Sequence, residues 1–231
     1  PSIVKIAAWG DRHVASLQEN IAPCLLAPGN LPALCAASPT ELILYTDRPA
    51  ALAVVEDVPG LTFNVRMLDG LPDAAALPAN RRVLARTDAE SARLAGARGA
   101  DWFGFQADTL VSDEFLPRVK GLLVDHLAVA GSPVRMDLQA FRAVQNLRGR
   151  GGGRRFGAGE LRNLSMVCLH DVTDGYFVRD PPAVIPADPH QLLFKIPGGF
   201  AARTWQFCPF GIGPEGLRPM MQDDEEEAID D

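Results

Sequence analysis

Short apolar runs that suit β-strands alternate along this chain with segments of helical spacing, and this alternation most constrains the fold. Four runs rich in β-branched and aromatic residues, at residues 3–8, 41–46, 62–68 and 102–107, indicate strands, and the first of them indicates a buried strand. Segments between them repeat apolar residues every three to four positions, as amphipathic helices do. This pattern predicts βαβ units, and therefore an α/β fold with a mostly parallel central sheet and helices on both faces.

Further patterns complete the expected secondary structure. Pro23 is expected to kink the first helix or end it early. Two strands around a Pro-Gly-Gly turn predict a C-terminal hairpin. We therefore expect a single α/β domain over residues 1–221. The additional elements expected are a fifth strand at 124–130, helices at 12–26, 80–99, 114–123, 137–147 and 159–173, and hairpin strands at 192–196 and 200–207.

Two segments are unlike the rest of the chain in composition. Residues 148–157, RGRGGGRRFG, combine arginines with glycines that disfavour any regular element, so we expect a flexible Arg/Gly loop. Its arginines suit phosphate groups, although a solvated loop explains it equally. Residues 222–231 form an acidic tail whose seven acids account for the whole net charge of −7. The remaining body is neutral and gives no electrostatic basis for binding nucleic acid.

The sequence also bears on the compartment. No run of about 18 apolar residues is present, so no membrane span is expected. The first residues lack the pattern of a secretory signal. The cysteines form no CxxC pair, which favours thiols in a reducing compartment over a zinc site or disulfides. These observations predict a cytoplasmic protein. The cysteines are Cys24, Cys35, Cys168 and Cys208.

Polar or glycine residues follow three of the expected strands. Trp9 and Gly10 follow the first strand, Asp47 the second, and Asp108 the fourth. In parallel sheets, ligands bind outside the carboxyl ends of the strands, so these residues are candidates for a site. Each also has a purely structural interpretation: the aspartates as caps or turn residues, the tryptophan as a cover for the sheet edge, and the glycine as a tight turn.

The segment WFGFQADTLVSDEFL, residues 102–116, resembles the part of GT-A glycosyltransferases where an apolar strand ends in an acidic D-x-D motif. The N-terminal stretch AAWGDRHVASLQENIAPCLLAPGNLPAL, with LILYTD after it, resembles bacterial proteins of the same glycosyltransferase-like kind, as do GELRNLSMVCLHDVTDGYF and KIPGGFAARTWQFCPF. The resemblance covers most of the chain, and residues 25–34 are its most specific piece. It implies a GT-A, Rossmann-like fold.

The resemblance also implies a binding site. The D-x-D carboxylates of the family hold a divalent metal, Mn or Mg, against the diphosphate of a nucleotide-sugar. In this chain Gln106 stands at the first acidic position, and a neutral amide is a much weaker metal ligand. The residues implied are Ala8, Trp9, Gly10 and Asp47 for the nucleotide, Gln106, Asp108 and Asp113 for the diphosphate and metal, and His170 or His190 as a late ligand.

The function that follows is transfer of a sugar from a nucleotide-sugar donor to an acceptor that the sequence does not identify. The resemblance implies that the C-terminal half binds this acceptor. Gln106 and the lack of a convincing carboxylate base favour the alternative, a non-catalytic glycosyltransferase-like protein that binds a ligand or a partner. A scaffold acting through the acidic tail is a third interpretation. Whether the chain is an enzyme is left open at this point, because the fold does not decide among these functions.

Overall fold

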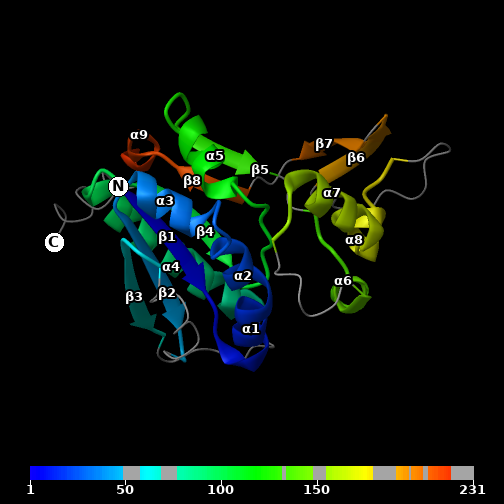
Figure 1. Cartoon of the computed structure of the whole chain (residues 1–231), viewed down its shortest axis with the longest axis horizontal. Coiled ribbons are helices and arrows are strands. Elements are labelled where there is room, and N and C mark those ends of the chain that lie inside the picture. Colours follow the sequence, from blue (N-terminus) through cyan, green and yellow to red (C-terminus); the bar gives the residue numbers. More distant parts are fainter. Residues whose placement is uncertain are drawn as a thin grey trace. The chain divides into compact units, whose positions relative to one another are not determined.

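The computed structural model describes residues 1–48, 58–68, 77–131, 134–147, 155–178, 191–197, 199–204 and 208–219 (Figure 1). The chain divides into two compact units. The first contains Pro1–Val129, Arg154–Phe156 and Pro209–Asp231, and the second contains Ala130–Gly153 and Gly157–Cys208. The single domain expected over residues 1–221 therefore comprises two compact units.

The described part of the first unit is built on a six-stranded sheet of order β3-β2-β1-β4-β8-β5. Strands β3, β2, β1 and β4 run parallel, and β8 pairs antiparallel with β4. The sheet is therefore mixed but mostly parallel, as the strand–helix alternation predicts. Its strands are β1 (Ser2–Ala7), β2 (Thr40–Thr46), β3 (Leu61–Met67), β4 (Asp101–Gln106), β5 (Ala128–Gly131) and β8 (Cys208–Ile212).

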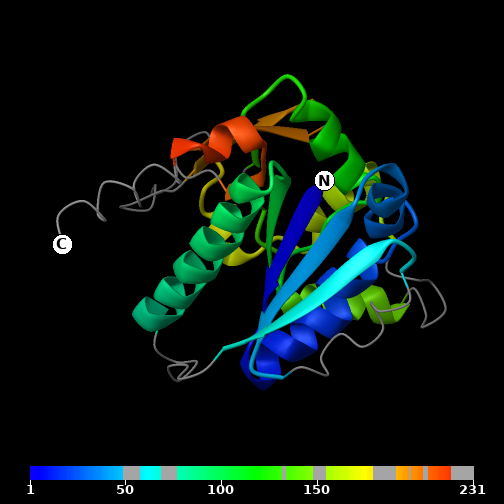
Figure 2. The same cartoon turned by 90° about the vertical axis from the view of Figure 1, so that its left-hand side faces the viewer.

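Helices lie on both faces of this sheet. Helix α4 (Leu77–Ala97) covers one face, and α1 (Gly10–Ser16), α2 (Ala22–Leu25) and α3 (Leu31–Ala37) lie on the other (Figure 2). β1 and β2 are buried along their whole length, as strands covered on both faces must be. The core between sheet and α4 is formed by apolar and aromatic residues of the strands and the helix, among them Ile3, Trp9, Tyr45, Val83 and Trp102. Helices α5 (Phe115–Leu122) and α9 (Pro214–Leu217) complete the unit.

The helical segment after β1 runs without a break past Pro23, contrary to the expectation of an early end. A five-residue π-helical turn, η1 (Leu17–Ile21), separates α1 from α2, and Pro23 lies at the start of α2. Proline lacks the N–H that an α-helix interior requires, and the change of hydrogen-bonding pattern at a π turn accommodates that loss. The helical path then ends at Leu26, whose N–H donates to the carbonyl of Ala22 at 2.9 Å.

Two strands differ from the expectation. β5 begins at Ala128 instead of residue 124, because residues 123–125 still turn back onto α5: the Leu123 and Asp125 N–H groups donate to the carbonyls of Val119 and Leu122. The second difference is β8, which the sequence patterns do not predict. It contains Pro209 and Gly211, and it inserts between β4 and β5 although it is distant from both in the chain.

The second unit contains three helices among its described residues, α6 (Leu138–Leu147), α7 (Ala158–Val167) and α8 (Asp171–Asp174), and a two-stranded antiparallel sheet. That sheet pairs β6 (Gln191–Ile196) with β7 (Gly199–Thr204), where the hairpin is expected. A small core of Tyr176, Phe177 and Leu193 holds the unit together, with Met166 and Leu169 packed against it. Residues 148–154 of the Arg/Gly loop lie outside the described residues, and so does the whole acidic tail, residues 222–231.

Within these described ranges, no helix has the length and apolar character needed to cross a membrane. Among the described residues, Cys24, Cys35 and Cys168 form no disulfide. Burial raises the pKa of both Cys35 and Cys168, so neither is activated as a thiolate.

Candidate active site

The strand order creates a topological switch point between β1 and β4. From β1 the chain continues outward to β2 and β3, and then returns through α4 to place β4 on the other side of β1. In open α/β sheets, ligands bind outside the carboxyl ends of the two strands that flank such a point. We use the name switch-point site for the residues that follow these strand ends and the neighbouring end of β2: Ala8, Trp9, Gly10, Asp47, Gln106 and Asp108.

The polypeptide turns sharply after β1. The Ala8 N–H donates to the carbonyl of Tyr45 at 2.9 Å, which extends the β1–β2 pairing by one residue. Trp9 is extended, with φ −141° and ψ 157°, and α1 begins at Gly10 with φ +66°. A positive φ is costly for residues with a Cβ, so glycine suits this turn. The Gly10 N–H donates to both carboxylate oxygens of Asp47, at 3.2 and 3.1 Å. Asp47 therefore fixes the turn after β1.

Trp9 points into the core instead of the solvent. The residue is only 6% exposed and packs in the core cluster between the sheet and α4. Its Nε1 has no hydrogen-bond partner among the described residues. The side chain of Ala8 is fully buried. A nucleotide at this edge would thus meet the backbone of Ala8 and Trp9 more readily than their side chains.

Gln106 and Asp108 flank a turn at the end of β4. The Thr109 N–H donates to the carbonyl of Gln106 at 3.1 Å, and the Thr109 hydroxyl accepts from the Gln106 N–H at 3.3 Å. Ala107 is buried, whereas Gln106 and Asp108 are exposed. Gln106 pairs in register with Ala7 of β1, so this turn and the Trp9–Gly10 turn lie at the same edge of the sheet. Asp108 has no ion-pair or hydrogen-bond partner for its carboxylate within the described part of the chain.

Asp113, the third acidic candidate, is occupied by contacts of its own. Its carboxylate side chain is 10% exposed. One carboxylate oxygen accepts from the Gly29 N–H at 3.0 Å, and the other from Nε of Arg155 at 2.5 Å. Its backbone N–H donates to the carbonyl of Phe156 at 2.7 Å. Asp113 therefore ties three segments of the first unit together, and a metal ion would have to compete with Arg155 for it.

Asn30 adds a second tie to the same region, one that the sequence analysis did not identify. The residue is fully buried. Its Nδ2 donates to the carbonyls of Cys24 and Ser112 at 2.8 and 3.0 Å, and its Oδ1 accepts from the Leu116 N–H at 3.1 Å. The segment that leaves the Asp108 turn is thereby fixed to the turn before α3. No local pattern distinguishes this asparagine, because all its partners except Cys24 are distant in the chain.

An ion pair between a buried lysine and a half-exposed aspartate joins β1 to α4. Lys5 is 1% exposed, and its ammonium contacts the Asp88 carboxylate of α4 at 2.5 Å. Burial lowers the pKa of Lys5 below its ordinary value of 10.5, although Asp88 partly opposes this shift. The sequence signal for this pair is the lysine within the otherwise apolar run IVKIAA.

His170, a candidate late ligand, lies in the second unit. It precedes α8, where its Nδ1 accepts a hydrogen bond from the Val172 N–H at 3.1 Å. The imidazole therefore caps the start of α8 through Nδ1, and its second nitrogen, Nε2, takes no part in this hydrogen bond. The other candidate, His190, lies outside the described residues.

The residues at this edge could hold a divalent metal only if a bound molecule supplies most of the metal's ligands. Among the described residues, no group of three His, Cys, Asp or Glu side chains gathers to hold an ion. Asp108 offers one exposed carboxylate, and Gln106 an amide. Mg²⁺ commonly binds through one or two carboxylates with phosphate oxygens and water as the remaining ligands. The residues thus suit a metal that arrives with, and is held mainly by, a diphosphate.

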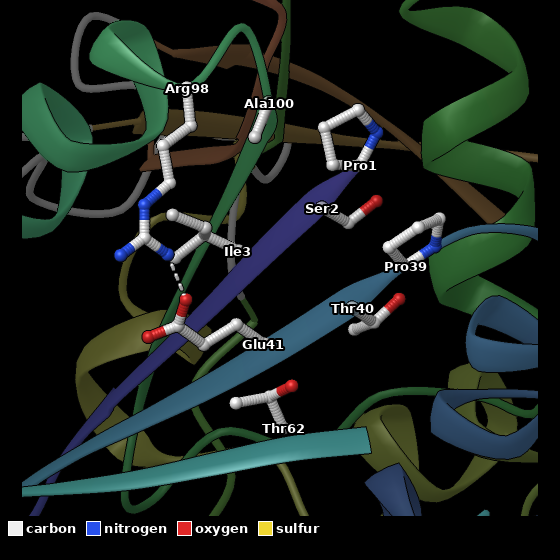
Figure 3. Close-up of a pocket in the computed structure, with 9 residues that line it drawn as sticks. All are labelled: Pro1, Ser2, Ile3, Pro39, Thr40, Glu41, Thr62, Arg98 and Ala100. Carbon is white, nitrogen blue, oxygen red and sulfur yellow. Dashed lines mark hydrogen bonds and ion pairs between the residues drawn. The ribbon is translucent and has the colours of Figure 1, made fainter. Parts of the chain in front are cut away.

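A small cavity of about 150 Å³ lies at the opposite edge, between the amino ends of the strands (Figure 3). Figure 3 shows Arg98 reaching the Glu41 carboxylate across this cavity. The other Glu41 oxygen accepts from Nδ2 of Asn64 at 2.6 Å. Both carboxylate oxygens are therefore committed, and none of the buried side-chain polar atoms that lack a partner belongs to a residue that lines this cavity.

Comparisons of the chain with protein-family models, with curated proteins and with solved structures find no match.

Proposed function

We propose that this chain is a glycosyltransferase-like protein that binds a nucleotide-sugar at the switch-point site and transfers its sugar to an acceptor. The observation that carries the proposal is the meeting of the Gly10 turn, fixed by Asp47, with the exposed and unpartnered Asp108 at one edge of a parallel sheet. The resemblance of residues 102–116 to the GT-A segment supports the same assignment.

In this proposal the chain's residues divide the work of binding. Asp47 and Gly10 hold the turn against which the nucleoside lies. Asp108 supplies the carboxylate that faces the metal and the diphosphate. Gln106 offers amide N–H donors, which can bond to phosphate oxygens that a carboxylate would repel. A bound Mn²⁺ or Mg²⁺ would supply charge neutralisation for the departing diphosphate.

A second function is favoured by one specific observation. Gln106 replaces the first acid of the expected motif, and Asp113 is engaged by Gly29 and Arg155. Asp108 is thus the one described carboxylate of the switch-point site beside β4. This arrangement favours a protein that binds the nucleotide-sugar without transferring the sugar. Mass spectrometry of the nucleotide-sugar after incubation separates the two: release of nucleoside diphosphate indicates catalysis, and intact donor indicates binding alone.

Calorimetric titration with UDP and GDP, with and without Mn²⁺, tests binding itself. We expect saturable, metal-dependent binding of at least one nucleotide. The substitution Asp108→Asn removes the charge with little change of shape, and we expect it to weaken this binding about tenfold or more, since charge-assisted contacts are worth roughly 1.5–3 kcal/mol.

Asp125→Asn is the matched control, because Asp125 is also an exposed aspartate of the first unit but lies beyond α5. We expect it to bind like the wild type. Absence of binding for both nucleotides, or equal affinity of the Asp108→Asn variant and the wild type, would contradict the proposal.

A further inference from the structure

A second pocket lies at the carboxyl edge of the sheet, over different strands from those of the switch point. Its volume is about 380 Å³, within the usual range of small-ligand sites, roughly 300–1,000 Å³. The walls come from the ends of β2 and β3 and from the middle of α4. We call it the β3–α4 pocket; its polar and apolar lining includes Tyr45, Arg66, Leu68, Arg86, Thr87 and Glu90.

The lining carries an excess of positive charge. Arg66 of β3 pairs with Glu90 of α4, so these two charges balance. Arg86 lies one helical turn before Glu90, but Glu90 is already committed to Arg66. The other acidic residue of α4, Asp88, is committed to the buried Lys5. Arg86 is therefore a cation without a partner among the described residues, at the mouth of a polar pocket.

Tyr45, which also lines the pocket, has a polar group without a partner. The residue is 2% exposed, and its hydroxyl has no hydrogen-bond partner among the described residues. A buried hydroxyl without a partner is costly, and such groups are rare in folded proteins. The guanidinium of Arg66, the residue's register partner on β3, lies 5.9 Å from the centre of its ring. Burial also raises the pKa of Tyr45, so the hydroxyl remains a proton donor at neutral pH.

We propose that the β3–α4 pocket binds a small oxyanion, a phosphate or a carboxylate, which Arg86 engages and to which Tyr45 donates a hydrogen bond. The planar guanidinium fork matches two oxygens of either group. The bound oxyanion satisfies the two groups of the pocket lining that the fold leaves without partners. This proposal is independent of nucleotide binding at the switch-point site.

NMR titration of the full chain tests the proposal, with inorganic phosphate in one arm and acetate in the other at constant ionic strength. We expect saturable shifts of the Leu68, Arg86 and Thr87 amides in at least one arm, with a dissociation constant of about 1 mM. The arm that binds more tightly identifies the oxyanion. Failure of both arms to saturate in the wild type overturns the proposal.

Three variants assign the site. Arg86→Gln should weaken binding about tenfold or more, and Tyr45→Phe several-fold, since each removes one donor to a charged ligand. Arg82→Gln is the matched control: Arg82 is exposed on the same helix, one turn earlier, and does not line the pocket. Affinity equal to the wild type in Arg86→Gln or Tyr45→Phe overturns the proposal. Nucleotide binding is expected to be unchanged in Arg86→Gln, so the two proposals can fail separately.

Discussion

Replacing Asn30 with alanine is expected to lower the free energy of unfolding by about 3 kcal/mol. The substitution removes three hydrogen bonds made by a fully buried side chain. It leaves the N–H of the buried Leu116 without an acceptor and the carbonyl of Ser112 without this donor. Each buried polar group left unpaired costs roughly 1–3 kcal/mol. Urea denaturation followed by circular dichroism measures the loss.

Asn64→Ala serves as the comparison for that measurement. Asn64 is exposed on β3 and makes one side-chain hydrogen bond, to Glu41. Its replacement should cost about 1.5 kcal/mol, the lower end for a hydrogen bond to a charged group, because Arg98 still pairs with the Glu41 carboxylate. Equal losses for Asn30→Ala and Asn64→Ala would show that the buried contacts of Asn30 do not hold the segment after Asp108 in place.

Removing Asp88 is expected to have a comparably large effect, about 3 kcal/mol for Asp88→Ala. The reason is Lys5, which remains buried at 1% exposure but loses its counter-charge. Breaking a buried ion pair from one side costs roughly 3–5 kcal/mol, and we take the lower end because the Asp88 side chain is 42% exposed. Lys5→Met should cost less than about 1 kcal/mol, since it removes the buried charge and leaves a half-exposed carboxylate that water can solvate.

The same pair predicts a dependence of stability on pH. Burial lowers the pKa of Lys5 in the folded protein below 10.5, so the unfolded chain binds more protons than the folded one in the window just below pH 10.5. Stability therefore rises with pH in this window. In Asp88→Ala the folded pKa of Lys5 falls further, and the window opens at lower pH.

Unfolding curves recorded at neutral pH and near pH 10 provide the measurement. The wild type should gain stability relative to Lys5→Met as the pH rises, and the deficit of Asp88→Ala should shrink. A deficit of Asp88→Ala that is independent of pH, or a loss in Lys5→Met as large as in Asp88→Ala, would contradict this account of the pair.

The parallel half of the sheet was predictable from sequence because the composition of each short segment marks it as a strand. Each of the four parallel strands begins and ends within one residue of its expected bounds. All four are short runs rich in β-branched and aromatic residues, so composition alone reveals them, although only β1 and β2 are buried along their whole length. β8 was not predictable in this way. Its Pro209 and Gly211 disfavour a strand by local propensity, and its place beside β4 depends on pairing between distant segments.

Part of the candidate site could likewise be predicted from sequence, and part could not. Trp9, Gly10, Asp47 and Asp108 could be grouped in advance, because the carboxyl ends of parallel strands share one edge, and the structure places them at that edge. The burial of Trp9 could not be foreseen, since it depends on the packing of α4. The engagement of Asp113 likewise requires Gly29 and Arg155, which lie 84 and 42 residues away.

The residues that support the site, Asn30, Lys5 and Asp88, could be identified only from the three-dimensional structure. Asn30 joins segments more than 80 residues apart, and no helical or strand periodicity marks such a residue. Lys5 and Asp88 are separated by 83 residues. The position of Lys5 within an apolar strand indicates a buried charge. The identity of its partner, Asp88, depends on how α4 crosses the sheet.

Paramagnetic NMR with Mn²⁺ and the nucleotide that binds tests the central claim most directly. Mn²⁺ broadens the resonances of nearby amides, so it reports where the metal and diphosphate lie. If the ligand occupies the switch point, the amides of Gly10, Gln106 and Asp108 lose intensity, while those of Ser2, Thr40 and Thr62 at the opposite edge keep theirs. Broadening at Ser2, Thr40 and Thr62 with Gly10 and Asp108 unaffected would place the ligand elsewhere and contradict the account.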